Sequence, residues 1–195
     1  MAAATDTGPR VDTGSRLIHL ALAVGGIGAV ATGELAEDAG FGASLHTWLG
    51  ITLAAALALR ILWGVIGPLH ARFSYWVPYS TARLKLAGED LLGLLALKLP
   101  RRPAHQGLAG LVQSFGLAVF AWMALTGLPL YFFGAPGEDE GGVIGVLEEL
   151  HEAGEGLAWA YLALHVGAVV VHSLAGHDEW QDMFFMRRQQ NAGER

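Results

Sequence analysis

The stretch LHTWLGITLAAALALRILWGVIGPL, residues 45–69, decides the fold of this 195-residue chain. It is long enough to cross a bilayer, because a transmembrane helix needs about 20 predominantly apolar residues. A single charged residue, Arg60, interrupts it near its end. The stretch therefore predicts a membrane-spanning helix.

Three further stretches have the same character, at residues 17–35, 107–133 and 150–175. The whole chain is 53% hydrophobic and 15% charged, with a mean hydropathy of +0.41, well away from soluble averages. We therefore predict an all-α integral membrane protein built as a four-transmembrane-helix bundle. The remaining apolar run, residues 91–99, is too short to span. With leucines at 84, 91 and 95, it is typical of an amphipathic helix in the membrane interface between spans 2 and 3.

The charges predict the orientation of the bundle. All twelve Lys and Arg residues fall on one side of the four-span topology, whereas the opposite loops, residues 34–44 and 134–149, contain acidic residues and no Lys or Arg. The positive-inside rule then places both termini in the cytoplasm. In a second interpretation, the first apolar run is a secretory signal peptide ending in AVA at residues 29–31. Its removal would leave an odd number of spans.

The expected organisation is one membrane domain, residues 14–176, between a disordered cytoplasmic tail at 1–13 and a cytoplasmic C-terminal tail at 177–195. The chain contains no cysteine. This excludes disulfides, cysteine-ligated iron–sulfur clusters, zinc–thiolate sites and the covalent attachment of a c-type haem. We expect no nucleic-acid partner.

Four histidines form the main candidate site. His151 and His165 are fourteen residues apart, so on a helix they face nearly the same direction and are separated by about 21 Å along the axis. By depth, His19 matches His165 on the cytoplasmic side, and His46 matches His151 on the external side. Each pair joins two helices, as bis-histidine ligation of a b-type haem requires. We therefore predict two haems b with these axial ligands to iron.

His172 offers an alternative on the cytoplasmic side. It follows His165 by seven residues and lies about 20° from the same helix face. It is either the ligand in place of His165 or a residue of a quinone site or of the propionate side. The other histidines, His70, His105 and His177, lie in loops, where we expect them to be solvated.

Arg60 and four glycines have two interpretations each. Arg60 either extends its charge to the interface or pairs with a propionate of the cytoplasmic-side haem. The glycines either leave room for a flat macrocycle or serve ordinary close packing of helices; they are Gly25, Gly26, Gly28 and Gly50.

These residues resemble the bacterial di-haem cytochrome b561 family, which includes the cytochrome b subunits of membrane-bound hydrogenases. The resemblance covers about residues 16–188. Its motifs are R-x-x-H at 16–19, LHTWLG at 45–50, RILWGVIGPLHARF at 60–73, TGL at 126–128, and ELHE and LHV in the fourth span. The sequence departs from the family pattern at Leu20, where tryptophan is frequent, and at PAHQGLAG, residues 103–110, where GHNP is usual. The resemblance implies two b haems held by His19, His46, His151 and His165, in a multi-pass protein of the bacterial cytoplasmic (inner) membrane.

The expected function is electron transfer across the bilayer between the quinone pool and an external-side redox partner, such as a cytochrome c or a hydrogenase-type subunit. The chain would act alone or as the membrane subunit of a quinone-linked oxidoreductase. The acidic segment 137–142, with Glu148, Glu149 and Glu152, either docks a basic cytochrome c or is simply solvated. Two other functions remain: a haem-free membrane anchor of a redox complex, or a histidine-lined metal or proton transporter. A transporter predicts carboxylates at mid-bilayer, and the apolar parts of the spans contain none.

Overall fold

A computed structural model of the chain describes residues 11–36, 40–100, 106–134, 142–177 and 180–184. Within these ranges the chain is helical and contains no strand. Four helices are long and apolar enough to cross a membrane, which confirms the predicted all-α four-span fold. They are α1 (Thr13–Ala31), α2 (Phe41–Ile66), α5 (Leu108–Phe133) and α6 (Val143–Leu174).

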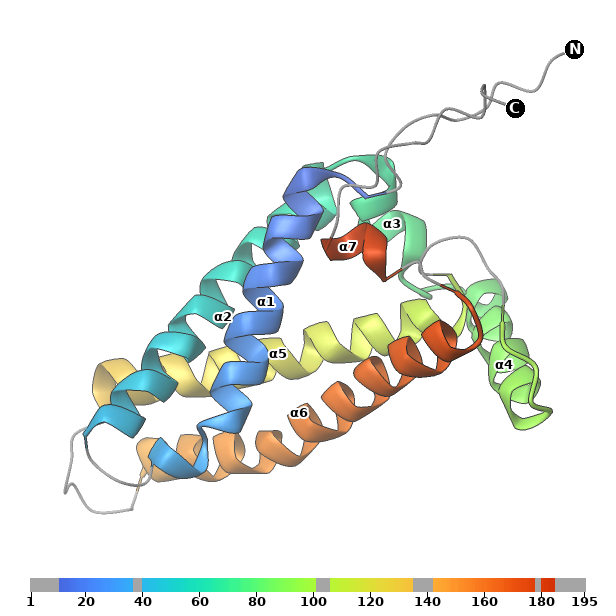
Figure 1. Cartoon of the computed structure of the whole chain (residues 1–195). Helices are drawn as coiled ribbons and strands as arrows, with labels where there is room; N and C mark the ends of the chain where they lie inside the picture. Colours follow the sequence, from blue (N-terminus) through green and yellow to red (C-terminus); the bar gives the residue numbers. More distant parts are fainter. Residues whose placement is uncertain (1–10, 37–39, 101–105, 135–141, 178–179, 185–195) are drawn as a thin grey trace, which may run out of the picture.

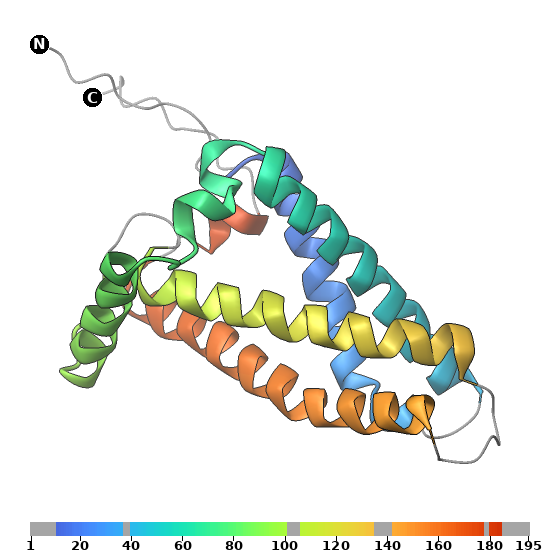
Figure 2. The same ribbon diagram turned by 180° about the vertical axis from the view of Figure 1, so that it is seen from behind.

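The four long helices form two hairpins (Figures 1 and 2). α1 packs along α2, and α5 packs along α6. α2 also packs against α5, whereas α1 contacts α6 in fewer places. The hairpins meet at one end of the molecule and diverge toward the other. We call the first the acidic end, because it holds Glu34, Glu148 and Glu149, and the second the basic end, because it holds Arg16 and Arg60.

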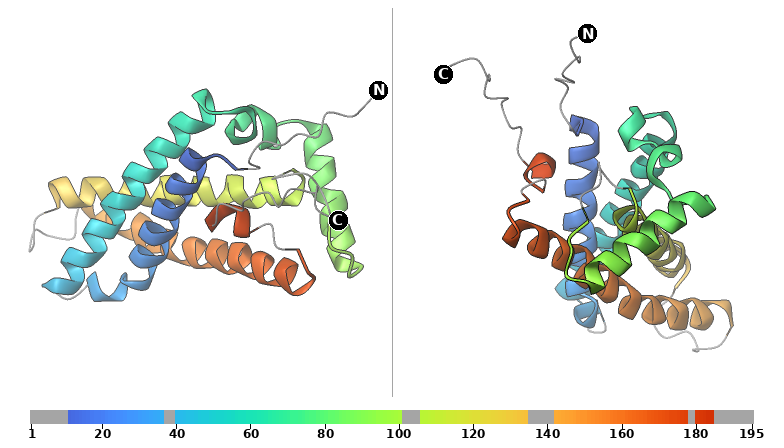
Figure 3. Two further views of the ribbon diagram at one scale, coloured as in Figure 1. Left: turned by 45° about the horizontal axis from the view of Figure 1, so that its top comes forward. Right: turned by 90° about the vertical axis from the view of Figure 1, so that its right-hand side faces the viewer.

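The short helices gather at the basic end (Figure 3). α4 packs against α5, and α7 packs against α1. A 3-10 helix, η1, follows α1 at the acidic end. The bounds of these elements are η1 (Glu34–Ala36), η2 (Leu69–Ala71), α3 (Phe73–Trp76), α4 (Thr81–Leu95) and α7 (Gln181–Phe184).

Two spans begin earlier than hydropathy predicts. α1 starts at Thr13, because the Asp12 side chain accepts a hydrogen bond from the Ser15 backbone N–H at 3.0 Å and caps the helix. Residues 11–13, expected in a disordered tail, are therefore ordered; residues 1–10 lie outside the described part. α6 starts at Val143 rather than at residue 150. Hydropathy missed this start because Glu148 and Glu149, in the second turn, make the segment polar.

The helix between spans 2 and 3 is also shifted. Ser80 caps α4 at its start by accepting from the Arg83 backbone N–H at 3.3 Å. The helix ends because Leu97 adopts a left-handed backbone, with φ of 57°, and Lys98 N–H reaches back to the Gly93 carbonyl at 2.8 Å. Residues 96–99 are thus not helical. The leucines expected on its apolar face are exposed, and the position of α4 in the membrane interface stays a prediction.

Glycines let α1 and α2 approach closely. A Cβ added to Gly25 would lie 2.8 Å from the Leu53 backbone nitrogen, and one added to Gly28 would lie 2.9 Å from the Leu49 side chain. A Cβ at Gly26 would lie 2.8 Å from the Phe120 ring of α5. These three glycines therefore allow close packing of helices, the second of the two interpretations that the sequence offered, rather than making room for a macrocycle.

Two clusters of buried side chains hold the hairpins together. Val30, Val119 and Ala158 form the first, from α1, α5 and α6. Leu53 and Leu57 of α2 form the second with Phe120 of α5, and Leu162 of α6 packs against both clusters. Most other apolar side chains of the spans are exposed, as expected for surfaces that face lipid.

Asp12 ties the start of α1 to the end of α2. Its Oδ1 accepts from the Trp63 indole N–H at 3.2 Å, and its Oδ2 lies 2.8 Å from His70 Nε2. His70 is thus half-buried and paired, so the prediction that it is solvated is wrong. Burial raises the pKa of Asp12, but the hydrogen bonds from Ser15 and the proximity of His70 outweigh this and lower the pKa from 3.8 to about 2.

Asp12→Ala is expected to lower the free energy of unfolding by about 1 to 2 kcal/mol at neutral pH, because the cap and two side-chain bonds are lost. A carboxylate with a lowered pKa stabilises the folded state above its unfolded pKa. The difference between wild type and variant should therefore shrink as the pH falls from above 3.8 toward 2. Unfolding curves measured in detergent across this pH range test this expected pH dependence. The control is Glu152→Ala, which removes an exposed carboxylate of α6. A difference independent of pH would contradict the account.

Candidate functional site

The structure brings four of the predicted site histidines together in two pairs. The rings of His19 on α1 and His165 on α6 have centroids 6.3 Å apart and planes inclined by 50°. The rings of His46 on α2 and His151 on α6 have centroids 6.2 Å apart and planes inclined by 88°. Each pair therefore joins one helix of the first hairpin to α6 of the second.

Both separations fit one metal atom held between two imidazoles. A metal–imidazole nitrogen bond is about 2 Å long, and a five-membered ring with bonds of about 1.3 Å places each nitrogen about 1 Å from the ring centre. Two such arms give about 6 Å between centroids. Among the described residues, no group of three or more His, Asp or Glu could hold a metal ion. Two axial nitrogens are what a haem iron takes from a protein, since the porphyrin supplies the other ligands.

Hydrogen bonds fix the tautomers of the acidic-end pair. His46 Nδ1 lies 3.0 Å from the Ala29 carbonyl oxygen, which can only accept, so Nδ1 carries the proton. His151 Nδ1 lies 2.8 Å from the Thr126 hydroxyl, which itself donates to the Trp122 carbonyl at 2.9 Å. The hydroxyl therefore accepts from His151 Nδ1–H. Both Nε2 atoms are left with a free lone pair for a metal, with the orientation of each ring held by a partner on another helix.

Small residues shape the acidic-end site. A Cβ added to Gly127 would lie 2.8 Å from His151 Cε1, so this glycine of α5 makes room for the imidazole. Gly50 lies one turn after His46, and nothing lies within 4 Å of a Cβ added there. Of the four glycines expected to leave room for a macrocycle, Gly50 alone faces open space.

The basic-end pair is held by aromatic side chains. His165 stacks on Tyr161 at 5.5 Å with planes inclined by 25°, and the Tyr161 ring meets the edge of Phe120 at 5.3 Å. His19 packs against the Phe184 ring of α7 at 5.7 Å. His19 Nδ1 is buried and has no hydrogen-bond partner among the described residues.

The structure brings His165, and not His172, next to His19. His172 is partly exposed, its Nδ1 donates to the Ala168 carbonyl of its own helix at 2.8 Å, and its ring lies 6.0 Å from that of His177. The sequence suggests neither this contact nor the burial of His177 Nδ1, so the prediction that His177 is solvated is wrong in part. His105 lies outside the described residues, as does most of the acidic segment 137–142.

Arg60 is held by other groups at the basic end. Its Nη1 donates to the Ala71 carbonyl at 3.1 Å, and its guanidinium lies over the rings of Phe73 and Trp76 at 5.2 and 5.4 Å. These contacts join α2 to the chain that follows it. The pairing of Arg60 with a haem propionate stays a prediction.

Comparison with known proteins supports the haem interpretation. A family model described as prokaryotic cytochrome b561 matches residues 10–186, which is most of the chain and includes all four paired histidines. The searches of curated proteins and of solved structures each gave no match.

Proposed function

This chain belongs to the prokaryotic cytochrome b561 family and is a multi-pass membrane b-type cytochrome of electron transfer, and from that premise we propose that it moves electrons across the bilayer through two haems b. His19 and His165 would hold one haem at the basic end. His46 and His151 would hold the other at the acidic end. The observation that supports this most is the matched separation of the two imidazole pairs, 6.3 and 6.2 Å.

The residues of the chain do three things in this mechanism. His46 and His151 would offer their Nε2 lone pairs to one haem iron, and His19 and His165 would each offer a ring nitrogen to the other. Ala29 and Thr126 hold the protons at Nδ1 and orient the acidic-end rings. Tyr161 and Leu162 of α6, which pack against the buried cluster of Leu53, Leu57 and Phe120, would keep water away from the space between the pairs. When bound, haem supplies the one-electron ferric–ferrous couple.

The two sites are placed as a relay. Fourteen residues of α6 separate His151 from His165, about 21 Å along the helix axis, a large part of the hydrocarbon thickness of about 30 Å. With the basic end in the cytoplasm, electrons pass between the membrane quinone pool and a redox protein on the external side.

The first test is the visible spectrum of the purified detergent-solubilised protein, reduced minus oxidised, with haem b quantified per chain. We expect two low-spin haems per chain. One haem would mean that one histidine pair is not a ligand pair. If the protein purified from cells supplied with haem contains none, the proposal is overturned, and the membrane-anchor and transporter functions become the remaining explanations.

Thr126→Val is expected to weaken haem binding at the acidic end about tenfold, because the partner that orients a ligating histidine is lost while side-chain shape is kept. Haem content at limiting haem supply measures this. The matched control is Thr52→Val, because Thr52 also donates to a carbonyl of its own helix, at 2.8 Å, but has no histidine partner. Equal haem content in both variants would contradict the role of Thr126.

A further inference from the structure

Arg16 carries a buried nitrogen without a partner. It lies in the first turn of α1, three residues before His19 and hence on nearly the same helix face. Its Nε is buried and makes no hydrogen bond to any residue that the structure describes. A buried guanidinium nitrogen without an acceptor is unfavourable, and in a membrane protein such a cation normally has an anionic partner.

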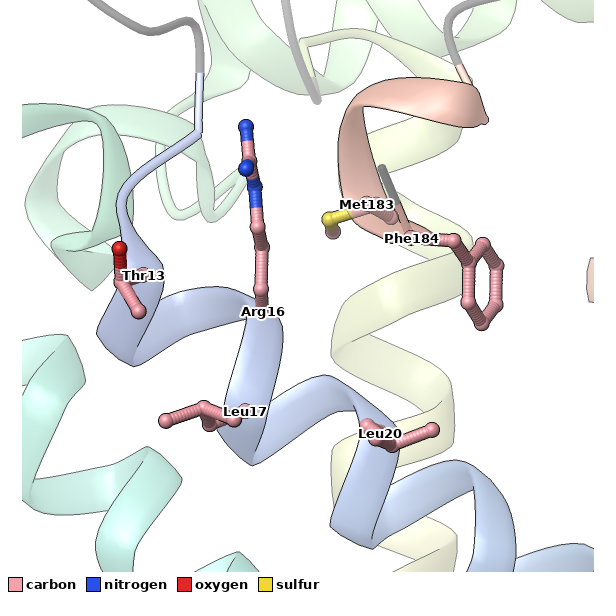
Figure 4. Close-up of a pocket in the computed structure, with 6 residues that line it drawn as sticks. All are labelled: Thr13, Arg16, Leu17, Leu20, Met183 and Phe184. Atoms are coloured by element: carbon pink, nitrogen blue, oxygen red, sulfur yellow. The ribbon is translucent and has the colours of Figure 1, made fainter. Parts of the chain in front are cut away.

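A cavity adjoins Arg16 (Figure 4). Its volume is about 180 Å³. It is lined by Thr13, Arg16, Leu17 and Leu20 of α1 and by Met183 and Phe184 of α7. Arg16 is the one charged residue of this lining, and the lining contains no carboxylate.

The cavity and the basic-end histidine pair share a wall. Phe184 lines the cavity and also packs its ring against His19 at 5.7 Å. An anion bound by Arg16 would therefore lie at the edge of a group held between His19 and His165. A haem carries two carboxylates at one edge, and a guanidinium binds a carboxylate through parallel hydrogen bonds.

We propose that Arg16 binds a propionate of the basic-end haem in this cavity, with α7 closing over it. This rests on the proposed function, because it requires a haem between His19 and His165. It differs from the expectation for Arg60, whose guanidinium already contacts the Ala71 carbonyl and two aromatic faces. The two arginines form a matched pair for the test, since both lie at the basic end.

The test compares Arg16→Gln with Arg60→Gln by potentiometric titration of the purified holoprotein. Loss of the cation beside the haem favours the ferric form, so Arg16→Gln should lower one of the two midpoint potentials. We expect a shift of about 59 mV, which corresponds to a tenfold change in the one-electron equilibrium constant. Both haems should stay low-spin. Arg16→Lys, which keeps the charge but not the planar fork, should shift that midpoint less. Arg60→Gln should shift neither.

The source of the carboxylate is tested by reconstituting the apoprotein with haem or with its dimethyl ester. Arg16→Gln should weaken binding of haem about tenfold at one site and leave binding of the ester unchanged. Three results would each overturn the proposal: Arg16→Gln weakens binding of haem and of the ester equally, Arg16→Gln leaves both midpoint potentials unchanged, or Arg60→Gln lowers a midpoint potential instead. A wild-type protein without haem would instead refute the proposed function, so the two failures are distinguishable.

Discussion

His165→Ala is expected to reduce the haem content from two haems per chain to one, whereas His172→Ala keeps both. The ring centroid of His165 lies 6.3 Å from that of His19, while His172 is hydrogen-bonded to its own helix. In the proposed pairing, alanine at 165 removes one of the two protein ligands of the basic-end haem, so we expect that haem to be lost. Electron transfer from quinol to an external acceptor should fall to background, because the relay is interrupted.

His46→Ala should give the complementary result, the loss of the acidic-end haem alone. The two sites are more than 10 Å apart along α6, so their losses should be independent. Haem per chain and reduced-minus-oxidised spectra of the three variants measure this. Retention of both haems with unchanged spectra in His46→Ala or His165→Ala would show that the pairing is wrong.

Gly116→Ala is expected to lower the free energy of unfolding by about 2 to 3 kcal/mol, the upper range for overpacking. A Cβ on Gly116 would overlap the Tyr161 ring. That ring is confined by the edge of Phe120 and stacks on His165, so it has no free direction in which to move. The same displacement should lower occupancy of the basic-end haem site.

The matched control for this substitution is Gly167→Ala on α6, where nothing lies within 4 Å of the added Cβ. There we expect a gain of up to about 1 kcal/mol, because alanine favours helix over glycine. Unfolding in mixed detergent and the haem content of both variants provide the measurements. A Gly116→Ala protein as stable as Gly167→Ala would show that Tyr161 is loosely held.

The sequence predicted the features that depend on the position of a residue along a span. Hydropathy alone placed four helices, and depth alone matched His19 with His165 and His46 with His151. Both arguments need only the rise of a helix and the thickness of a bilayer. The sequence left His172 as an alternative to His165, because the two share nearly one helix face about two turns apart, and the structure brings His165 next to His19 and His172 next to His177.

Features that depend on tertiary contact were not predictable. Gly25 and Gly50 look alike in the sequence, yet one packs on the Leu53 backbone and the other faces open space. The bond between Asp12 and His70 joins residues far apart in the chain, so no local pattern indicates it. The approach of Phe184 to His19 depends on how the chain turns after α6, where Gly176, with φ of +80°, ends the helix.

Both imidazole pairs cross from the first hairpin to α6, and this has a consequence for how the protein is made. Hairpins inserted into lipid one after the other gain little from the hydrophobic effect when they meet. With haem as the proposed ligand, each iron cross-links the early-synthesised half of the chain to its last span. Ligand binding stabilises only the state that binds it. Under the proposed function, haem supply would therefore act as a checkpoint on biogenesis: in chains made under haem starvation only the two buried clusters would join the hairpins, and such chains should be cut more readily by membrane proteases.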